Sequence, residues 1–304
     1  MAKAGTERAA RGHPGPGHKI VSPMPYTTLV TTDDLSAHLH SAEWVVFDCR
    51  FTLTDPAAGR RAYDKAHIPN ARYAHLDDDL AAPLSGTNGR HPLPDPARLA
   101  AKLGAWGVGP TTQVVVYDDS FGAMAGRLWW LLRWLGHGQV ALLDGGWQKW
   151  VREGHAITLE PPAITPARFE ARARPELLLD AQAVLAALEQ DALIIDARAD
   201  VRFTGEHETL DPVGGHVPGA VNWPYEDNLD LDGTFLPADE LRELYLGVLA
   251  GRPASGAIHM CGSGVTACHN LIAMEVAGLP GGKLYPGSWS EWVADPTRPV
   301  ATGG

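Results

Sequence analysis

The sequence predicts an α/β fold that is built twice, as two successive domains whose mainly parallel sheets are covered by helices on both faces. Three observations support this prediction. Short apolar strand segments alternate with helical segments along the chain, which is typical of parallel sheets. Several short motifs of the first half recur in the second half in the same order. The length of 304 residues is sufficient for two domains of ordinary size.

The elements of the first half can be justified in order. A helix is predicted over 32–41, because polar capping residues stand at its start. The apolar segment 44–47 predicts a buried strand that ends in Asp48-Cys49-Arg50. By the same criteria, the later elements are a helix near 97–103, strands at 114–117 and 140–143, and helices over 123–135 and 147–153.

The second half repeats this arrangement. Asp196-Ala197-Arg198 repeats the motif at 48–50, residues 216–220 repeat 67–71, and residues 284–292 repeat 142–150. These matches at a nearly constant separation indicate a tandem duplication of one domain. We therefore expect a disordered tail over 1–23, a first domain over 24–153, a linker rich in Pro, Ala and Arg over 154–175, and a second domain over 176–304.

Composition excludes several classes of partner. The formal charge of −11 argues against nucleic acid or an anionic membrane surface. No apolar run approaches the ~20 residues that a membrane-spanning helix needs. The three cysteines show no disulfide spacing, which favours a reducing cytoplasm.

The segment 257–268 is the strongest functional signal, because it reads as a buried strand, a glycine loop and the start of a helix. Cys261 stands at the turn. Backbone N–H groups of the loop and the positive end of the helix both favour a thiolate there. Gly262 and Gly264 allow close approach of a ligand, and Thr266 is expected to cap the helix. Cys261 is therefore predicted to be a nucleophile rather than an inert core residue.

The residues after Cys261 separate two cysteine chemistries. A phosphatase loop needs an arginine at the position that Ala267 holds. The sequence Cys-Gly-Ser-Gly-Val-Thr-Ala instead resembles the active-site loop of the rhodanese superfamily, in the version found in 3-mercaptopyruvate sulfurtransferases. Thiosulfate-using rhodaneses typically place Arg and Lys where this chain has Gly262 and Ser263. The resemblance implies tandem rhodanese-like domains, and the first is expected to be inactive because Asp118 stands at the place of the cysteine.

The resemblance also implies a reaction and a set of site residues. Cys261 would attack the sulfur of 3-mercaptopyruvate, form a persulfide with release of pyruvate, and pass the sulfur to a thiol, to cyanide or to a thioredoxin-like reductant. No cofactor or metal is implied. The backbone N–H groups of the loop would stabilise the anionic sulfur. These groups belong to Gly262, Gly264, Val265 and Thr266, which are predicted to bind the substrate.

The donor also needs a cation for its carboxylate and an acceptor for its thiol proton, and the resemblance points to other residues for both. Arg202 matches the arginine that binds substrate in the resembled family. That family usually supplies a second arginine some nine residues later, but the segment 205–211 contains none. For the thiol proton of the donor, the resemblance suggests a relay through Ser263, His91 and Asp77. Arg198 is mirrored in the first half and is expected to be structural.

Two alternatives stay open at this point, and a third is disfavoured. Thiosulfate is the second candidate donor, because the second arginine is missing. A persulfide carrier loaded by a partner enzyme is a candidate of a different class. A metal site is disfavoured, because its four candidate ligands are not expected to converge. Those ligands are His259, Cys261, Cys268 and His269.

Overall fold

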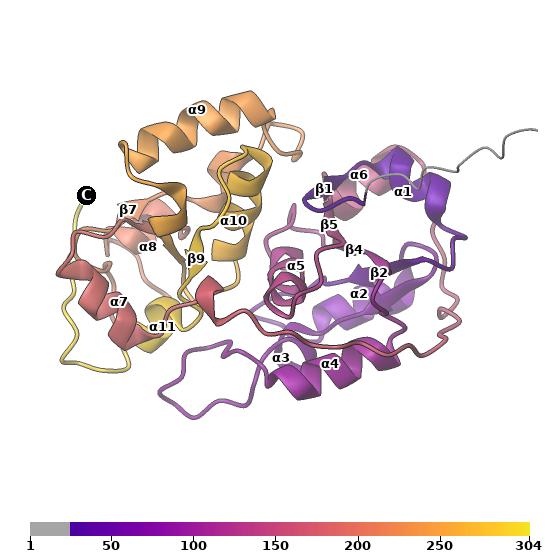
Figure 1. Ribbon diagram of the computed structural model, residues 1–304, viewed down its shortest axis with the longest axis horizontal. Helices are drawn as coiled ribbons and strands as arrows, with labels where there is room; N and C mark the ends of the chain where they lie inside the picture. The colour runs from indigo at the N-terminus through magenta and orange to yellow at the C-terminus, as the bar shows by residue number, and fades with distance from the viewer. Residues whose placement is uncertain (1–24) are drawn as a thin grey trace, which may run out of the picture.

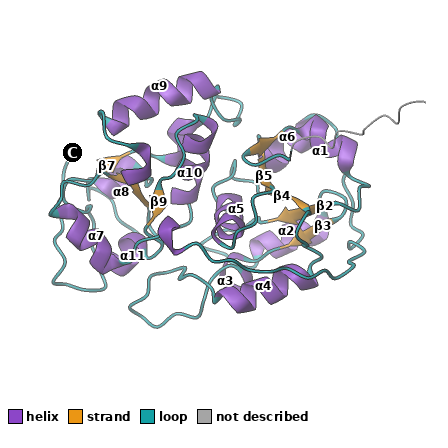
Figure 2. Ribbon diagram, viewed as in Figure 1, coloured by secondary structure: helices purple, strands orange, loops and turns teal. Residues whose placement is uncertain are grey.

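The computed structural model describes residues 25–304, which form two domains side by side, each built on a parallel sheet (Figure 1). The predicted tail over 1–23 lies outside the described residues. Both domains have the predicted α/β architecture, with helices packed around short central strands (Figure 2).

The first domain contains a five-stranded sheet of order β1-β5-β4-β2-β3 in which every neighbouring pair is parallel. The predicted strands and helices are present, with ends that differ by a few residues. Its elements are, in chain order, β1 (Leu29–Val30), α1 (Thr32–His38), β2 (Trp44–Asp48), α2 (Ala58–Lys65), β3 (Ala71–Tyr73), α3 (Leu76–Asp79), α4 (Pro96–Ala105), β4 (Gln113–Tyr117), α5 (Ala125–Trp134), β5 (Val140–Leu143) and α6 (Gly146–Arg152).

The second domain repeats this plan with a four-stranded parallel sheet of order β7-β6-β8-β9. Its elements are η1 (Pro175–Leu177), α7 (Ala181–Leu188), β6 (Ile194–Asp196), α8 (Asp200–Phe203), β7 (Val221–Asn222), η2 (Tyr225–Asn228), α9 (Ala238–Leu249), η3 (Ala254–Gly256), β8 (Ile258–Met260), α10 (Ala267–Val276), β9 (Lys283–Leu284) and α11 (Ser288–Trp292). The register gives the correspondence between copies, because Asp48 pairs with Tyr117 in one sheet and Asp196 with Met260 in the other. Asp118 and Cys261 are therefore equivalent, as each directly follows the equivalent strand.

Helix starts follow from local sequence. Thr31 caps α1 by accepting a hydrogen bond from the backbone N–H of Asp34, and Asp95 and Asp180 cap α4 and α7 in the same way. Each cap satisfies an N–H group that the first helical turn leaves without a partner. These caps fix where each helix begins beside the sheet.

A buried ion pair recurs in both copies. Arg50 Nη2 lies 2.6 Å from Asp48, and Arg198 Nη2 lies 2.6 Å from Asp196. Each guanidinium also donates to a backbone carbonyl and lies over a tryptophan ring. Because both partners of each pair are buried and hydrogen-bonded, removal of either would leave an uncompensated charge. Arg198 thus has the structural arrangement expected from its repeat.

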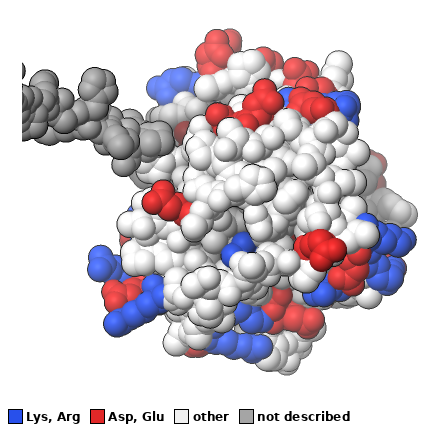
Figure 3. Space-filling model, turned by 90° about the vertical axis from the view of Figure 1, so that its right-hand side faces the viewer, with Lys and Arg blue, Asp and Glu red and all other residues white. Residues whose placement is uncertain are grey.

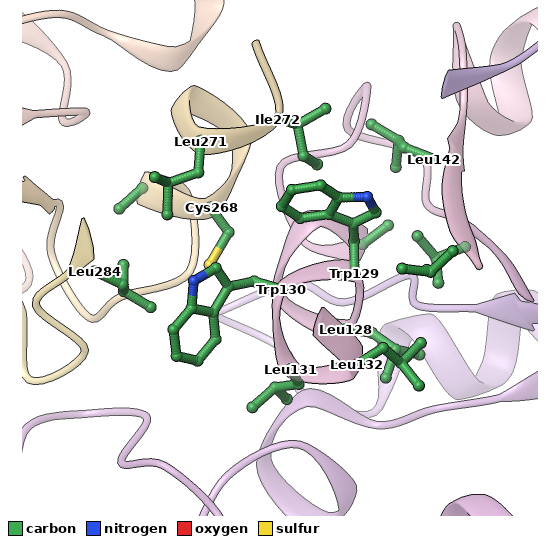
Figure 4. Packing of buried hydrophobic residues seen from close by; sticks show 14 of the residues in the cluster. Leu128, Trp129, Trp130, Leu131, Leu132, Leu142, Cys268, Leu271, Ile272 and Leu284 are labelled. Carbon is green, nitrogen blue, oxygen red and sulfur yellow. The ribbon is translucent and has the colours of Figure 1, made fainter. Parts of the chain in front are cut away.

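The two domains meet through α5 and α10 (Figure 4). Trp129 and Trp130 on α5 are only 2% and 3% exposed and belong to the same apolar cluster as Cys268, Leu271 and Ile272 on α10. Aromatic side chains of this size bury a large apolar area. One continuous core therefore joins the domains and fixes the loops that face each other across the interface.

Segment 154–175 has no helix or strand before Pro175 and follows the surface of the first domain, donating backbone hydrogen bonds to the carbonyls of Gly104 and Leu135. On the face shown in Figure 3, acidic and basic side chains lie interspersed around a broad uncharged area. No helix within residues 25–304 has both the length and the apolar character needed to cross a bilayer.

Candidate active site

Cys261 lies at the carboxyl end of β8, between that strand and α10, and is 2% exposed. Its backbone is fixed by the second domain, since its N–H donates to Ser288 Oγ at 3.1 Å and its carbonyl accepts from the N–H of Trp289 at 3.0 Å. It lines a pocket of about 180 Å³ at the domain interface. The walls come from both domains and are mainly apolar, with two arginines and a histidine: Phe51, Leu53, Leu76, Arg90, His91, Met124, Arg202, Leu210, Gly262, Ser263, Val265 and Thr266.

The loop after Cys261 presents backbone N–H groups without partners. Within residues 25–304, none of the five N–H groups from Gly262 to Thr266 donates a hydrogen bond to another residue. Gly264 has a positive φ of 73°, and a Cβ there would lie 2.3 Å from the carbonyl oxygen of Pro286. Only glycine fits this position. Buried N–H groups usually have partners, so a free set beside a cysteine is suited to an anionic sulfur.

The first domain shows such a loop filled by an anion. The Asp118 carboxylate, at the position equivalent to Cys261, is fully buried and accepts four backbone hydrogen bonds of 2.7–2.8 Å. The donors are the N–H groups of Ser120, Gly122, Met124 and Ala125. Burial raises the pKa of Asp118, and the four hydrogen bonds oppose that rise. The repeated loop can therefore hold a negative charge at this point.

The expected capping by Thr266 is wrong. Thr266 occupies the N-cap position of α10, but its side chain makes no capping hydrogen bond. Its backbone is already helical, with φ −67° and ψ −21°, whereas a capping side chain folds back from an extended residue. The N–H groups of Cys268 and His269, in the first turn of α10, donate instead to the backbone carbonyls of Val265 and Thr266, both at 3.0 Å.

The structure brings Ser263, His91 and Asp77 together, although they come from different domains. Ser263 Oγ lies 2.7 Å from His91 Nδ1, and His91 Nε2 lies 3.2 Å from Asp77 Oδ1. The histidine is 4% exposed and the serine 7%, whereas the side chain of Asp77 is 41% exposed. The three groups form a chain from the pocket toward solvent.

The pKa shifts of His91 and Asp77 define which groups of the relay carry a proton. Burial lowers the pKa of His91, an effect that hydrogen bonding to Asp77 opposes and the charge of Arg127 reinforces. Hydrogen bonding to His91 lowers the pKa of Asp77. At neutral pH the carboxylate is therefore ionised and the imidazole neutral. Because a carboxylate only accepts, Nε2 carries the proton and Nδ1 accepts from the Ser263 hydroxyl.

The first-domain loop that carries His91 packs closely against the second domain at this site. Gly89 has a positive φ of 79°, and a Cβ on it would lie 2.8 Å from the carbonyl oxygen of Gly287. The fully buried Arg127 donates to the carbonyls of His91 and Gly264, both at 2.9 Å, and so ties the relay loop to the cysteine loop. Sequence reasoning missed Arg127, because its partners are backbone atoms far away in the chain.

Arg202 lies in the pocket, and it is joined there by an arginine that sequence reasoning missed. Arg90, from the first domain, forms an ion pair with Asp211 at 2.8 Å, and Arg202 pairs with the same carboxylate at 2.9 Å. Glu208 accepts from Arg202 Nε. The only available signal for Arg90 was its place directly before His91, since the contact with Asp211 depends on how the domains pack.

A comparison with protein-family models matches the rhodanese-like domain twice, over residues 31–153 and 180–295. The chain belongs to the rhodanese-like family. A Pseudomonas aeruginosa protein named "Probable 3-mercaptopyruvate sulfurtransferase" is 50% identical over 283 residues, which is 92% of this chain and all of that protein. A Mus musculus "Thiosulfate sulfurtransferase" is 34% identical, with coverage of 93% of this chain and 98% of that one.

Solved structures of the rhodanese-like family agree with this assignment. The crystal structure of SseA from Escherichia coli, titled as a 3-mercaptopyruvate sulfotransferase, matches with a TM-score of 0.74 and 32% identity over 88% of this chain and all of that one. A 3-mercaptopyruvate sulfurtransferase from Leishmania major matches with a TM-score of 0.77 and 31% identity, covering 88% of this chain and 74% of that chain.

The other cysteine of this rhodanese-like domain is differently placed. Cys268 Sγ donates to the Gly264 carbonyl at 3.4 Å, and burial raises its pKa to about 12, so it stays a thiol. His269 is held by the Phe121 carbonyl and Asn228. Across residues 25–304, no cluster of three or more His, Cys, Asp or Glu side chains is arranged to hold a metal ion.

Proposed function

We propose that this protein is a sulfurtransferase that moves sulfur from 3-mercaptopyruvate through a persulfide on Cys261 to a thiol or cyanide acceptor. The observation that carries the proposal is the loop of unpartnered N–H groups around Cys261, which faces a relay of Ser263, His91 and Asp77. The names of the relatives, which include both mercaptopyruvate and thiosulfate sulfurtransferases, support the same class of reaction.

The first half-reaction can be written so that atoms and charges balance. The Cys261 thiolate attacks the sulfur of the donor, a sulfur–sulfur bond forms, and the carbon–sulfur bond breaks with its electron pair leaving as the enolate of pyruvate. The donor's thiol proton ends on that enolate carbon, which gives pyruvate and an anionic persulfide. The N–H groups from Gly262 to Thr266 stabilise the developing charge on sulfur. In the second half-reaction the acceptor takes the outer sulfur and the thiolate returns.

The relay of Ser263, His91 and Asp77 takes up the thiol proton of the donor and returns it to the product. Ser263 donates its own hydroxyl proton to the neutral His91 Nδ1 and accepts the thiol proton in exchange. The Asp77 carboxylate stabilises the imidazolium that forms. Returned through the same serine, the proton reaches the enolate. Arg202 binds the donor's carboxylate, since it lies in the pocket with Gly262 and is partly exposed.

Mercaptopyruvate is preferred over thiosulfate because the loop after Cys261 carries no cation for a dianion. Thiosulfate also has no thiol proton, so the relay would have no proton to transfer with this donor. Thiosulfate remains the second candidate donor, supported by the name of the mouse relative. The proposed acceptors are a small thiol, cyanide or a thioredoxin-like protein, in the reducing cytoplasm that the free cysteines favour.

Steady-state sulfur transfer to cyanide, with each donor in turn, tests this proposal. We expect kcat/KM for mercaptopyruvate to exceed that for thiosulfate by tenfold or more, about 1.4 kcal/mol of discrimination. Cys261→Ser should abolish turnover with both donors. Activity with neither donor would favour a persulfide carrier that is loaded by a partner enzyme, and substantial activity of Cys261→Ser would exclude the mechanism.

A further inference from the structure

The pocket holds a charged triplet that spans the domain interface. Asp211 accepts from Arg90 Nη1 at 2.8 Å and Nη2 at 3.3 Å, and from Arg202 Nη2 at 2.9 Å. Its side chain is only 3% exposed, whereas those of the arginines are 21% and 18% exposed. The backbone N–H of Arg90 donates to Ser290 Oγ of the second domain at 2.9 Å. Arg90 is therefore fixed to the catalytic domain at both its backbone and its side chain.

Both guanidinium groups face the residue next to the nucleophile. A Cβ built on Gly262 would lie 3.1 Å from Arg90 Nη2 and 3.3 Å from Arg202 Nη1. In the described part of the chain, Arg202 Nη1 has no hydrogen-bond partner, because Glu208 and Asp211 take the Nε and Nη2 donors. A free guanidinium donor thus points into the pocket beside a second guanidinium. Two such groups match the two oxygens of a carboxylate.

Asp211 lies nine residues after Arg202, at the separation where the resembled family usually has its second arginine. The charge at this sequence position is therefore opposite to the one that the resemblance implies. A second arginine, Arg90, reaches the Asp211 carboxylate from the first domain. Within this group of ion pairs the formal charges cancel, because Arg90, Arg202 and the buried Arg198 face three carboxylates. Those carboxylates are Asp196, Glu208 and Asp211.

We propose that Arg90 is the second arginine of a carboxylate-binding pair formed with Arg202 across the domain interface. Asp211 is the positioning residue that aligns the pair, and its charge restricts the site to a monoanionic donor. This inference rests on the proposed function and specifies how its donor is selected. A monoanion such as mercaptopyruvate meets two aligned donors, whereas the dianion thiosulfate meets the additional repulsion of Asp211.

The first test is Arg90→Gln. Its KM for mercaptopyruvate should rise roughly tenfold to hundredfold, as expected for loss of a charge-assisted hydrogen bond, with a smaller change in kcat. Arg90→Lys keeps the positive charge but loses the paired N–H donors of the guanidinium, so its KM should lie between those of the parent and Arg90→Gln. Calorimetry with pyruvate should show the same order of affinities without any need for turnover. The matched control is Arg252→Gln, since Arg252 forms a surface ion pair with Asp191 at 2.9 Å.

The second test is Asp211→Asn, which should shift the ratio of kcat/KM for thiosulfate over mercaptopyruvate upward by about tenfold or more. The removed charge repels the dianion by one charge more than the monoanion. The double variant Arg90→Gln/Asp211→Asn restores local neutrality, so its ratio should return toward that of the parent. Asp191→Asn is the control, and thermal melting of each variant verifies folding.

The outcomes separate this inference from the proposed function. Equal KM values and equal pyruvate affinities for Arg90→Gln and Arg252→Gln, or an unchanged donor ratio in Asp211→Asn, would overturn the inference while parent activity stands. A parent protein that makes no pyruvate from mercaptopyruvate would overturn the proposed function. Pyruvate binding that depends on Arg90 would support the carboxylate site even in that case.

Discussion

Replacement of Ser263 by alanine should affect the two donors very differently. Of the three relay residues, only Ser263 belongs to the loop that follows Cys261, and its hydroxyl oxygen lies 2.7 Å from His91 Nδ1. The substitution removes this hydroxyl but keeps the backbone N–H groups of the loop. Mercaptopyruvate loses its path for the thiol proton, whereas thiosulfate has no such proton.

The magnitude follows from the burial of the site. General acid–base catalysis contributes about 10² to 10⁴ in rate. Because His91 is 4% exposed, bulk solvent has little access to replace the serine. We therefore expect kcat/KM for mercaptopyruvate to fall by about a hundredfold or more, which corresponds to about 2.7 kcal/mol. The value for thiosulfate should stay within about threefold, since the N–H groups that stabilise sulfur remain.

The assay compares cyanolysis with both donors on the same preparation of the Ser263→Ala variant, so differences in folding or active fraction cancel. Transfer from a preformed persulfide to cyanide should be unchanged. An equal loss with both donors would refute the relay, because it would mean that Ser263 acts on the persulfide rather than on the donor's proton.

Further predictions concern pH and stability. Burial lowers the pKa of His91, so this histidine stays neutral, and able to accept the donor's proton, down to below pH ~6.5, the ordinary histidine value. The ratio of kcat/KM for mercaptopyruvate over thiosulfate should therefore be constant through neutral pH and fall only below that value. Asp77→Asn removes an interaction that raises the pKa of His91 and should move the fall to lower pH. Asp118→Ala leaves four backbone N–H groups without a partner, two of them in the buried residues Gly122 and Ala125, and should lower the free energy of unfolding by about 3 kcal/mol or more in urea denaturation. Thr266→Ala should cost under about 0.5 kcal/mol, because no capping bond is lost, whereas a cost near 1 kcal/mol would indicate a working cap.

The sequence was sufficient for features that depend on local pattern. The strand, loop and helix around Cys261 follow from an apolar segment and two glycines, and the repeated motifs predict two parallel sheets. The proximity of Ser263, His91 and Asp77 was expected only through the family resemblance, because no local pattern joins residues on two domains. Thr266 was assigned a cap from residue type alone, while its helical backbone forbids that geometry.

The features that sequence reasoning missed all depend on the packing of the domains. Arg127 satisfies two carbonyls from different domains, and Arg90 finds its carboxylate partner 121 residues away. Asp211 reads in the sequence as the loss of an arginine, and only the structure shows which arginine stands beside it. Such contacts are set by the apolar interface of α5 and α10, which leaves no periodic signal at the charged residues themselves.

The most direct test of the account is a single turnover with mercaptopyruvate in the absence of an acceptor. We expect one equivalent of pyruvate per protein and one added sulfur atom, located by peptide mass spectrometry on Cys261 and removed by cyanide. Cys261→Ser should form neither product. A persulfide on Cys49 or Cys268, or pyruvate released without a sulfur atom on Cys261, would contradict the central claim that this thiolate carries the sulfur.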